Sequence, residues 1–185
     1  MSVQARAGRV AVVGSNMVDL ITYVTRMPSP GETVEAPSFE MGCGGKGANQ
    51  AVAAAKLGSQ VSMITKVGDD LFGENTLRNL TSHGIDTRHV TVAAGESSGV
   101  APIFVEESGE NSILIVKGAN ADLLPRDVDA AEEVLREADL ILMQLEVPLE
   151  TVGYTVKRAA EWGVPTILNP APATPELDVG DLYSL

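Results

Sequence analysis

The chain has 185 residues, of which 44% are hydrophobic and 21% charged, a composition typical of a globular protein with a buried core. Its net charge of −12 argues against nucleic acid and anionic membrane surfaces as partners. No apolar stretch reaches membrane-spanning length, and the N-terminus lacks a signal-peptide core. The single cysteine, Cys43, excludes an intrachain disulfide and a thiolate metal cluster. These features predict a cytoplasmic protein.

The first element is a short apolar run, Val10 to Val13, which predicts a buried parallel strand ending at Gly14 and Ser15. Asp19 follows shortly after, at the position where open α/β sheets bind ligands beyond the carboxyl ends of their strands. A turn or capping aspartate is the alternative interpretation.

Two blocks of β-branched and aromatic residues interrupt the chain and predict strands where a simple crossover helix would be expected. The first block predicts strands at Leu20–Thr25 and Thr33–Glu35, and the second predicts strands at Ser98–Val105 and Ile113–Val116. Pro102 cannot donate to a ladder, so its strand is expected to lie at an edge or to bulge there. Together the segments at about 19–40 and 98–116 predict a small separate sheet.

The most distinctive stretch runs from Gly42 to Gln50 and has four glycines in six positions. An alanine-rich helix is predicted from Ala48 to Leu57, so the glycines form a loop that leads into a helix N-terminus. Such a terminus offers unpaired N–H groups to polar or anionic groups, and Lys46 and Asn49 add side-chain donors. The spacing fits neither a P-loop nor a dinucleotide fingerprint. A tight loop before a packed helix remains an equal alternative.

The remaining segments alternate between strands and helices. Strands are predicted at residues 61–66, 87–92, 140–144 and 166–168, and helices at 71–83, 125–138 and 149–162. Asp70, with Asp69, is expected to turn the chain and cap the helix that starts at Leu71, and neither histidine belongs to a metal-spaced set. The alternation predicts an α/β fold with a mostly parallel sheet and helices on both of its faces.

Glu146 also follows a predicted strand end, so it should share one rim of the sheet with Asp19 and the glycine loop. Two carboxylates, an amide and backbone N–H groups suit a neutral polyol, because carboxylates accept from hydroxyls while Lys46 and Asn49 donate to them. Cys43, beside the loop, is interpreted as a small packed residue rather than a reactive thiol.

A series of short motifs carries a family resemblance from about Val10 to the end of the chain. In chain order they are Gly14-Ser15, Asp19, Pro30-Gly31-Glu32-Thr33, Gly44-Gly45-Lys46-Gly47-Ala48-Asn49-Gln50, Gly68-Asp69-Asp70, Gly118-Ala119-Asn120, Gln144-Leu145-Glu146 and Asn169-Pro170-Ala171-Pro172-Ala173. This pattern resembles the ribokinase family of carbohydrate kinases, which includes fructokinases and adenosine kinases. The glycine-loop block and the Asn169 block are the specific ones.

The resemblance implies ATP-dependent phosphorylation of D-ribose at its 5-hydroxyl to give D-ribose 5-phosphate. It also implies Mg²⁺ and a monovalent cation such as K⁺ as further cofactors. The small sheet would be a lid that covers the sugar and pairs with a second subunit, so a homodimer is expected. The residues implied to hold the sugar are Asp19, Gly45, Lys46, Asn49 and Glu146.

One departure from the family concerns position 17. Some relatives carry Asn where this chain has Met17, which cannot supply the same hydrogen bond. Asn16, beside it, is the candidate replacement.

Two motifs expected in the nucleotide half of such kinases, Asn-x-x-Glu and Gly-Ala-Gly-Asp, do not occur in the chain. Residues 1–185 therefore predict an incomplete domain whose C-terminal nucleotide half is missing. The catalytic base is expected beyond Leu185, so no catalytic or metal-binding residue is assigned. The chain alone is expected to be inactive. Two other hypotheses are a non-catalytic sugar-binding or dimerising module and a kinase of a related sugar or nucleoside.

Overall fold

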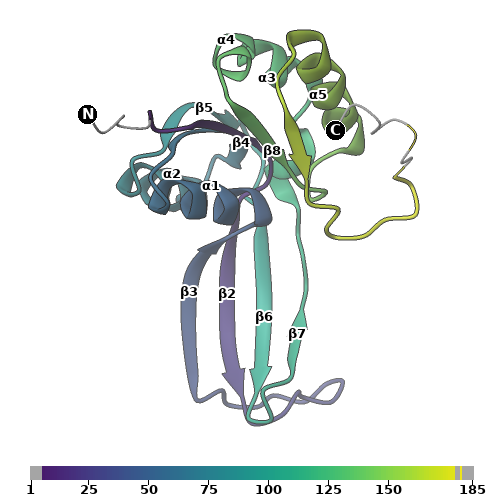
Figure 1. Cartoon of the computed structure of the whole chain (residues 1–185). Helices are drawn as coiled ribbons and strands as arrows, with labels where there is room; N and C mark the ends of the chain where they lie inside the picture. The colour runs from purple at the N-terminus through teal and green to yellow at the C-terminus, as the bar shows by residue number, and fades with distance from the viewer. Residues whose placement is uncertain (1–5, 178–179, 181–185) are drawn as a thin grey trace.

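A computed structural model describes residues 6–177 and 180 of the chain. The fold has two parts, a main sheet covered by helices and a second sheet that extends away from it (Figure 1). Among the helices described, none combines the length and apolar character needed to span a bilayer.

The main sheet has five strands in the order β5-β4-β1-β8-β9, and every neighbouring pair is parallel. The strands are β1 (Arg9–Val13), β4 (Gln60–Gly68), β5 (Asp86–Ala93), β8 (Leu140–Met143) and β9 (Thr166–Leu168). All five predicted strands are confirmed, with ends that differ by at most a few residues. Because the strands are parallel, their carboxyl ends meet at one edge of the sheet.

Helices cover both faces of the main sheet, as predicted. On one face lie α1 (Lys46–Lys56) and α2 (Leu71–Ser82), whose Ala51 and Leu80 pack with Val12 of β1. On the other face lie α3 (Pro125–Ala130), α4 (Glu132–Arg136) and α5 (Leu149–Trp162), which pack against Ala11 and Val13. Successive residues of β1 thus point into two different cores, which is why the strand is apolar throughout.

The helix predicted over residues 125–138 is divided in two. Ala131 has φ −103°, and its N–H bonds the carbonyl of Val128, three residues back, so α3 ends there before α4 begins. A 3₁₀ turn, η1 (Gly118–Asp122), precedes them. Asp70 is the N-cap of α2, with Oδ1 accepting from Gly73 N at 2.9 Å, which confirms the predicted cap.

The second sheet has the strand order β3-β2-β6-β7. It contains β2 (Met17–Val24), β3 (Ser38–Gly44), β6 (Val100–Glu106) and β7 (Asn111–Ile113). The separate small sheet is therefore confirmed. The strand predicted at Thr33–Glu35 is wrong, because the residues that pair antiparallel with β2 come after Pro37 and end at Gly44.

The prediction that Pro102 marks an edge strand or a bulge is also wrong. β6 lies inside the second sheet, between β2 and β7, and its register with β7 does not shift. Leu114 N donates to Pro102 O at 2.9 Å, but proline has no N–H to return the bond. β7 consequently ends at Ile113, and pairing resumes at the bridge between Val100 and Val116.

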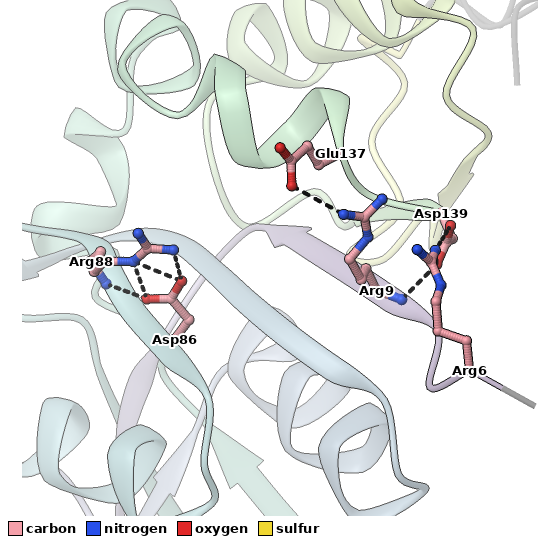
Figure 2. A network of polar contacts seen from close by, with 6 residues as sticks. All are labelled: Arg6, Arg9, Asp86, Arg88, Glu137 and Asp139. Atoms are coloured by element: carbon pink, nitrogen blue, oxygen red, sulfur yellow. Dashed lines mark hydrogen bonds and ion pairs between the residues drawn. The ribbon is translucent and has the colours of Figure 1, made fainter. Parts of the chain in front are cut away.

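The edge of the main sheet where the strands begin carries ion pairs (Figure 2). Arg6 binds Asp139 at 2.7 Å, Arg88 binds Asp86 at 2.7 Å, and Arg9 binds Glu137 at 3.0 Å. Arg6 and Asp139 are largely exposed, so water screens their attraction and they contribute little to stability.

Candidate functional site

The candidate site lies at the opposite edge, where the strands of the main sheet end. Ser15 follows β1, Lys46 begins α1, and Glu146 follows β8, while Asp19 comes from β2 of the second sheet. Hydrogen bonds join the first three of these residues. The prediction that the glycine loop and Glu146 share one rim agrees with these contacts.

Glu146 is the buried centre of this group, with only 4% of its surface exposed. Its Oε2 accepts hydrogen bonds from Ser15 Oγ at 2.6 Å and from Lys46 N at 2.9 Å. Its Oε1 lies 3.5 Å from Lys46 Nζ. A buried carboxylate is tolerated here because each oxygen faces a donor or a positive charge.

Most of the N–H groups at the N-terminus of α1 are not free for a ligand, contrary to the sequence-based expectation. Lys46 N bonds Glu146, Gly47 N bonds Ser15 Oγ at 3.2 Å, and Ala48 N bonds Ser15 O at 2.8 Å. Asn49 N makes the first bond within the helix, to Gly45 O at 2.9 Å. Three of the four N–H groups that the start of a helix leaves without a helical partner are therefore used by the protein itself, and Gly45 N is the fourth.

Asp19 is the second carboxylate of the site. Burial, and next the negative charge of Glu146, raise the pKa of Asp19 above its ordinary value. A Cβ added at Gly44 would lie against both carboxylate oxygens of Asp19, so this position must be glycine if Asp19 is to keep its place. Two like charges that influence each other across a partly open site suit a ligand that donates hydrogen bonds to both.

Gly45 joins β3 to α1 with φ +89°, a backbone conformation that favours glycine. A Cβ there would lie 2.7 Å from Met17 N, inside the contact distance of real atoms. The side chain of Asn49, one turn later, is exposed and forms no hydrogen bond with the described residues, so it is available to a ligand.

Asn16 is the candidate for the sugar hydrogen bond that Met17 cannot make, and the protein holds its amide nitrogen. Its side chain is fully buried, and its amide nitrogen donates to Thr65 Oγ1 and to Lys66 O, both at 2.8 Å. Asn120 holds its backbone, accepting from Asn16 N at 2.9 Å and donating to Asn16 O at 2.7 Å. These hydrogen bonds give Asn16 a structural role, while its buried Oδ1 has no hydrogen-bond partner among the described residues, so the predicted contact of Asn16 with the sugar stays a prediction.

Cys43 is half-buried, and Asn75 Nδ2 donates to its Sγ at 3.2 Å. Burial raises the pKa of the Cys43 thiol, the opposite of what an activated thiolate needs. These observations support a packed residue rather than a reactive thiol. Among the residues that the structure describes, no cluster of His, Cys, Asp and Glu could hold a metal ion.

Sequence reasoning missed three residues that shape this site: Ser15, Gly44 and Gly47. Ser15 bridges Glu146 and α1, and Gly44 leaves room for Asp19. A Cβ at Gly47 would lie 2.6 Å from Ser15 N, which explains the glycine. All three belong to the family motifs, but which atoms they touch depends on long-range packing.

Comparison with known proteins agrees with this geometry. The profile of the pfkB family of carbohydrate kinases matches residues 7–182. A deoxyribokinase from Salmonella typhi is 60% identical over 170 residues, covering 92% of this chain and 56% of the relative. A ribokinase from Bacillus subtilis is 46% identical over 166 residues, covering 90% of this chain and 56% of the relative. The chain thus spans about half the length of the curated relatives it matches.

Solved structures give the same result. The ribokinase of Giardia lamblia superimposes with a TM-score of 0.84 at 32% identity, covering 95% of this chain and 54% of that one. The Arabidopsis thaliana ribokinase, solved with ribose and ATP, gives 0.81 at 34% identity, covering 88% of this chain and 53% of that one. From the match over nearly all of its residues, the chain belongs to the pfkB family of carbohydrate kinases.

Proposed function

We propose that the full-length protein carrying this chain transfers a phosphoryl group from ATP to the 5-hydroxyl of a pentose, and that this chain supplies the sugar-binding part. The observation that carries the proposal is the group formed by Asp19, Lys46 and Glu146 at the carboxyl edge of the main sheet. Family membership supports the reaction type, and the ribose and ATP in one related structure support the two substrates.

Each residue has a role that follows from its chemistry. Asp19 and Glu146 accept hydrogen bonds from sugar hydroxyls, while Lys46 and Asn49 donate to sugar oxygens. Gly45 allows the turn that sets Lys46 beside Glu146. The proposal assigns Mg²⁺, K⁺ and the catalytic base to none of the described residues.

Two pentoses, D-ribose and 2-deoxy-D-ribose, fit this proposal, and two observations favour the second. Met17 is buried and, being two residues before Asp19 on β2, faces the same side of the second sheet. With Met at position 17, the wall beside Asp19 has one polar side chain fewer than in relatives with Asn there, and the amide nitrogen of Asn16 is held by Thr65 and Lys66. A sugar with one hydroxyl fewer leaves no hydrogen bond unmade there. The deoxyribokinase similarity at 60% identity points the same way.

We therefore expect the full-length protein to phosphorylate both pentoses, with a higher kcat/KM for 2-deoxy-D-ribose. Coupled ADP release with each sugar and Mg-ATP measures this preference. Met17→Asn should shift it toward D-ribose, because a new donor and acceptor can then meet the additional hydroxyl. Turnover of a nucleoside but of neither pentose would refute the proposal.

The second sheet is proposed to act as a lid over the sugar and to pair with a second copy. The register places Phe39, Met41 and Leu114 on the face opposite Asp19, with exposed fractions of 59%, 52% and 63%. Large apolar side chains gathered on one face of a protruding sheet mark an interaction surface. Because the contact would be the same on both copies, it would close as a two-fold dimer.

We expect sedimentation of the full-length protein to show a dimer that Met41→Lys together with Leu114→Lys converts to monomer. The two lysines would be costly to bury without partners. Leu57→Lys, at an exposed position after α1, is the matched control and should leave the dimer intact. Monomers in the wild type at high concentration would contradict the pairing without affecting the sugar site.

A further inference from the structure

The two oxygens of Glu146 have different surroundings. Oε2 receives two hydrogen bonds from the protein, from Ser15 Oγ at 2.6 Å and Lys46 N at 2.9 Å. Within the described part of the chain, the polar contact of Oε1 is with the Lys46 ammonium, at 3.5 Å. The carboxylate therefore has one oxygen committed to the fold and one left for a further donor.

Ser15 connects the three chain segments that meet at the site. Its fully buried hydroxyl donates to Glu146 after β8 and accepts from Gly47 N at 3.2 Å, while its carbonyl accepts from Ala48 N at 2.8 Å. A hydroxyl can donate and accept at the same time, which neither alanine nor a carboxylate can do. A donor is required because Glu146 is an acceptor, and an acceptor is required because Gly47 N is a donor.

We propose that Ser15 is a positioning residue that fixes the rotamer of Glu146, so that Oε1 alone, beside Lys46 Nζ, is presented to a sugar hydroxyl. This inference rests on the proposed function, because it assigns how the same site orients its acceptor. Without the Ser15 hydroxyl, Glu146 keeps the bond from Lys46 N to Oε2 and the Lys46 ammonium near Oε1, and the carboxylate is less restricted in turning about its Cγ–Cδ bond. The sugar then has to order Glu146 on binding, which lowers affinity.

The chain provides a matched control at its second helix start. Ser98 is also fully buried, and its Oγ donates to Asp70 Oδ1 at 2.6 Å and accepts from Gly68 N at 3.0 Å. Asp70 accepts from Gly73 N of α2 as Glu146 accepts from Lys46 N of α1, and each serine hydroxyl donates to such a carboxylate and accepts from a glycine N–H, in α1 for Ser15 and at the end of β4 for Ser98. Burial alone would raise the pKa of Asp70, but hydrogen bonds from Ser98, Gly73 and Phe72 outweigh it and lower that pKa. Asp70 is therefore held as a carboxylate in a structural position.

The experiment compares Ser15→Ala with Ser98→Ala in the full-length protein. Both variants should lower the urea midpoint, because each loses one hydrogen bond to a carboxylate and one from a backbone N–H. Only Ser15→Ala should weaken binding of 2-deoxy-D-ribose and D-ribose by isothermal titration, by about tenfold, the scale of one well-made polar contact. The affinity for ATP should stay the same in both variants.

A double-mutant cycle separates positioning from general damage. If Ser15 acts through Glu146, then Ser15→Ala added to Glu146→Gln should weaken sugar binding no further than Glu146→Gln alone. Additive losses, or an unchanged sugar affinity in Ser15→Ala, would overturn the inference while leaving the proposed function in place. A wild-type protein that binds neither pentose would instead overturn the proposed function, and with it this use of Glu146.

Discussion

Asp19→Asn should weaken pentose binding by about tenfold to a hundredfold, because a hydrogen bond to a partly buried carboxylate contributes about 1.5–3 kcal/mol. The affinity for ATP should be unchanged. The loss would appear mainly as a higher KM for the sugar, with a lower kcat if the remaining contacts hold the sugar less firmly. Titration calorimetry with each pentose measures the affinity, and an unchanged KM and kcat would remove Asp19 from the site.

The same substitution should make the fold more stable at neutral pH. Burial and the nearby Glu146 raise the pKa of Asp19, so the folded protein holds this proton to a higher pH than the unfolded chain does. Folding stability therefore falls as pH rises from the ordinary value of 3.8 through the raised pKa, and the loss persists at neutral pH. Asparagine carries no charge and avoids this loss. Urea unfolding at several pH values tests it.

Gly44→Ala is the matched control for Asp19. Its methyl group would displace the Asp19 carboxylate while leaving the charge in the protein. Sugar affinity should therefore fall as in Asp19→Asn, but the urea midpoint should fall rather than rise. Equal stability changes in the two variants would show that the charge of Asp19 is not what limits stability here.

The largest effect on stability is expected at a buried ion pair away from the site. Lys66 Nζ lies 2.9 Å from Asp127 Oδ1, and their side chains are only 8% and 11% exposed. Asp127 Oδ2 also accepts from Leu124 N at 2.9 Å at the start of α3. Removing one member of such a pair leaves an uncompensated buried charge, so Lys66→Met should cost about 3–5 kcal/mol of unfolding free energy.

Two further variants make this prediction specific. Adding Asp127→Leu to Lys66→Met should restore much of the lost stability, because no buried charge then remains without a partner. Arg6→Met, at the exposed pair with Asp139 shown in Figure 2, should change the urea midpoint little. A midpoint for Lys66→Met close to that of Arg6→Met would show that the pair is not isolated from water.

The sequence predicted the elements whose signals are local. α5 and β9 have the predicted bounds, because an apolar stripe defines the helix and Gly163, with φ 71°, ends it. β3 could not be placed in the same way, since the pairing partners of β2 rather than local propensity select Ser38–Gly44. The prediction of free N–H groups at the start of α1 was wrong for a related reason. The acceptor for Lys46 N is Glu146, which lies 100 residues away in the sequence.

The two carboxylates of the site lie on different sheets, Asp19 on β2 of the second sheet and Glu146 after β8 of the main one. Their separation therefore depends on the angle between the sheets, and a sugar that donates hydrogen bonds to both selects one range of that angle. Anything else that favours this range, such as a second copy packed on the second sheet, is then thermodynamically linked to the sugar. By reciprocity, the factor by which the sugar would strengthen the proposed dimer equals the factor by which the dimer would strengthen sugar binding.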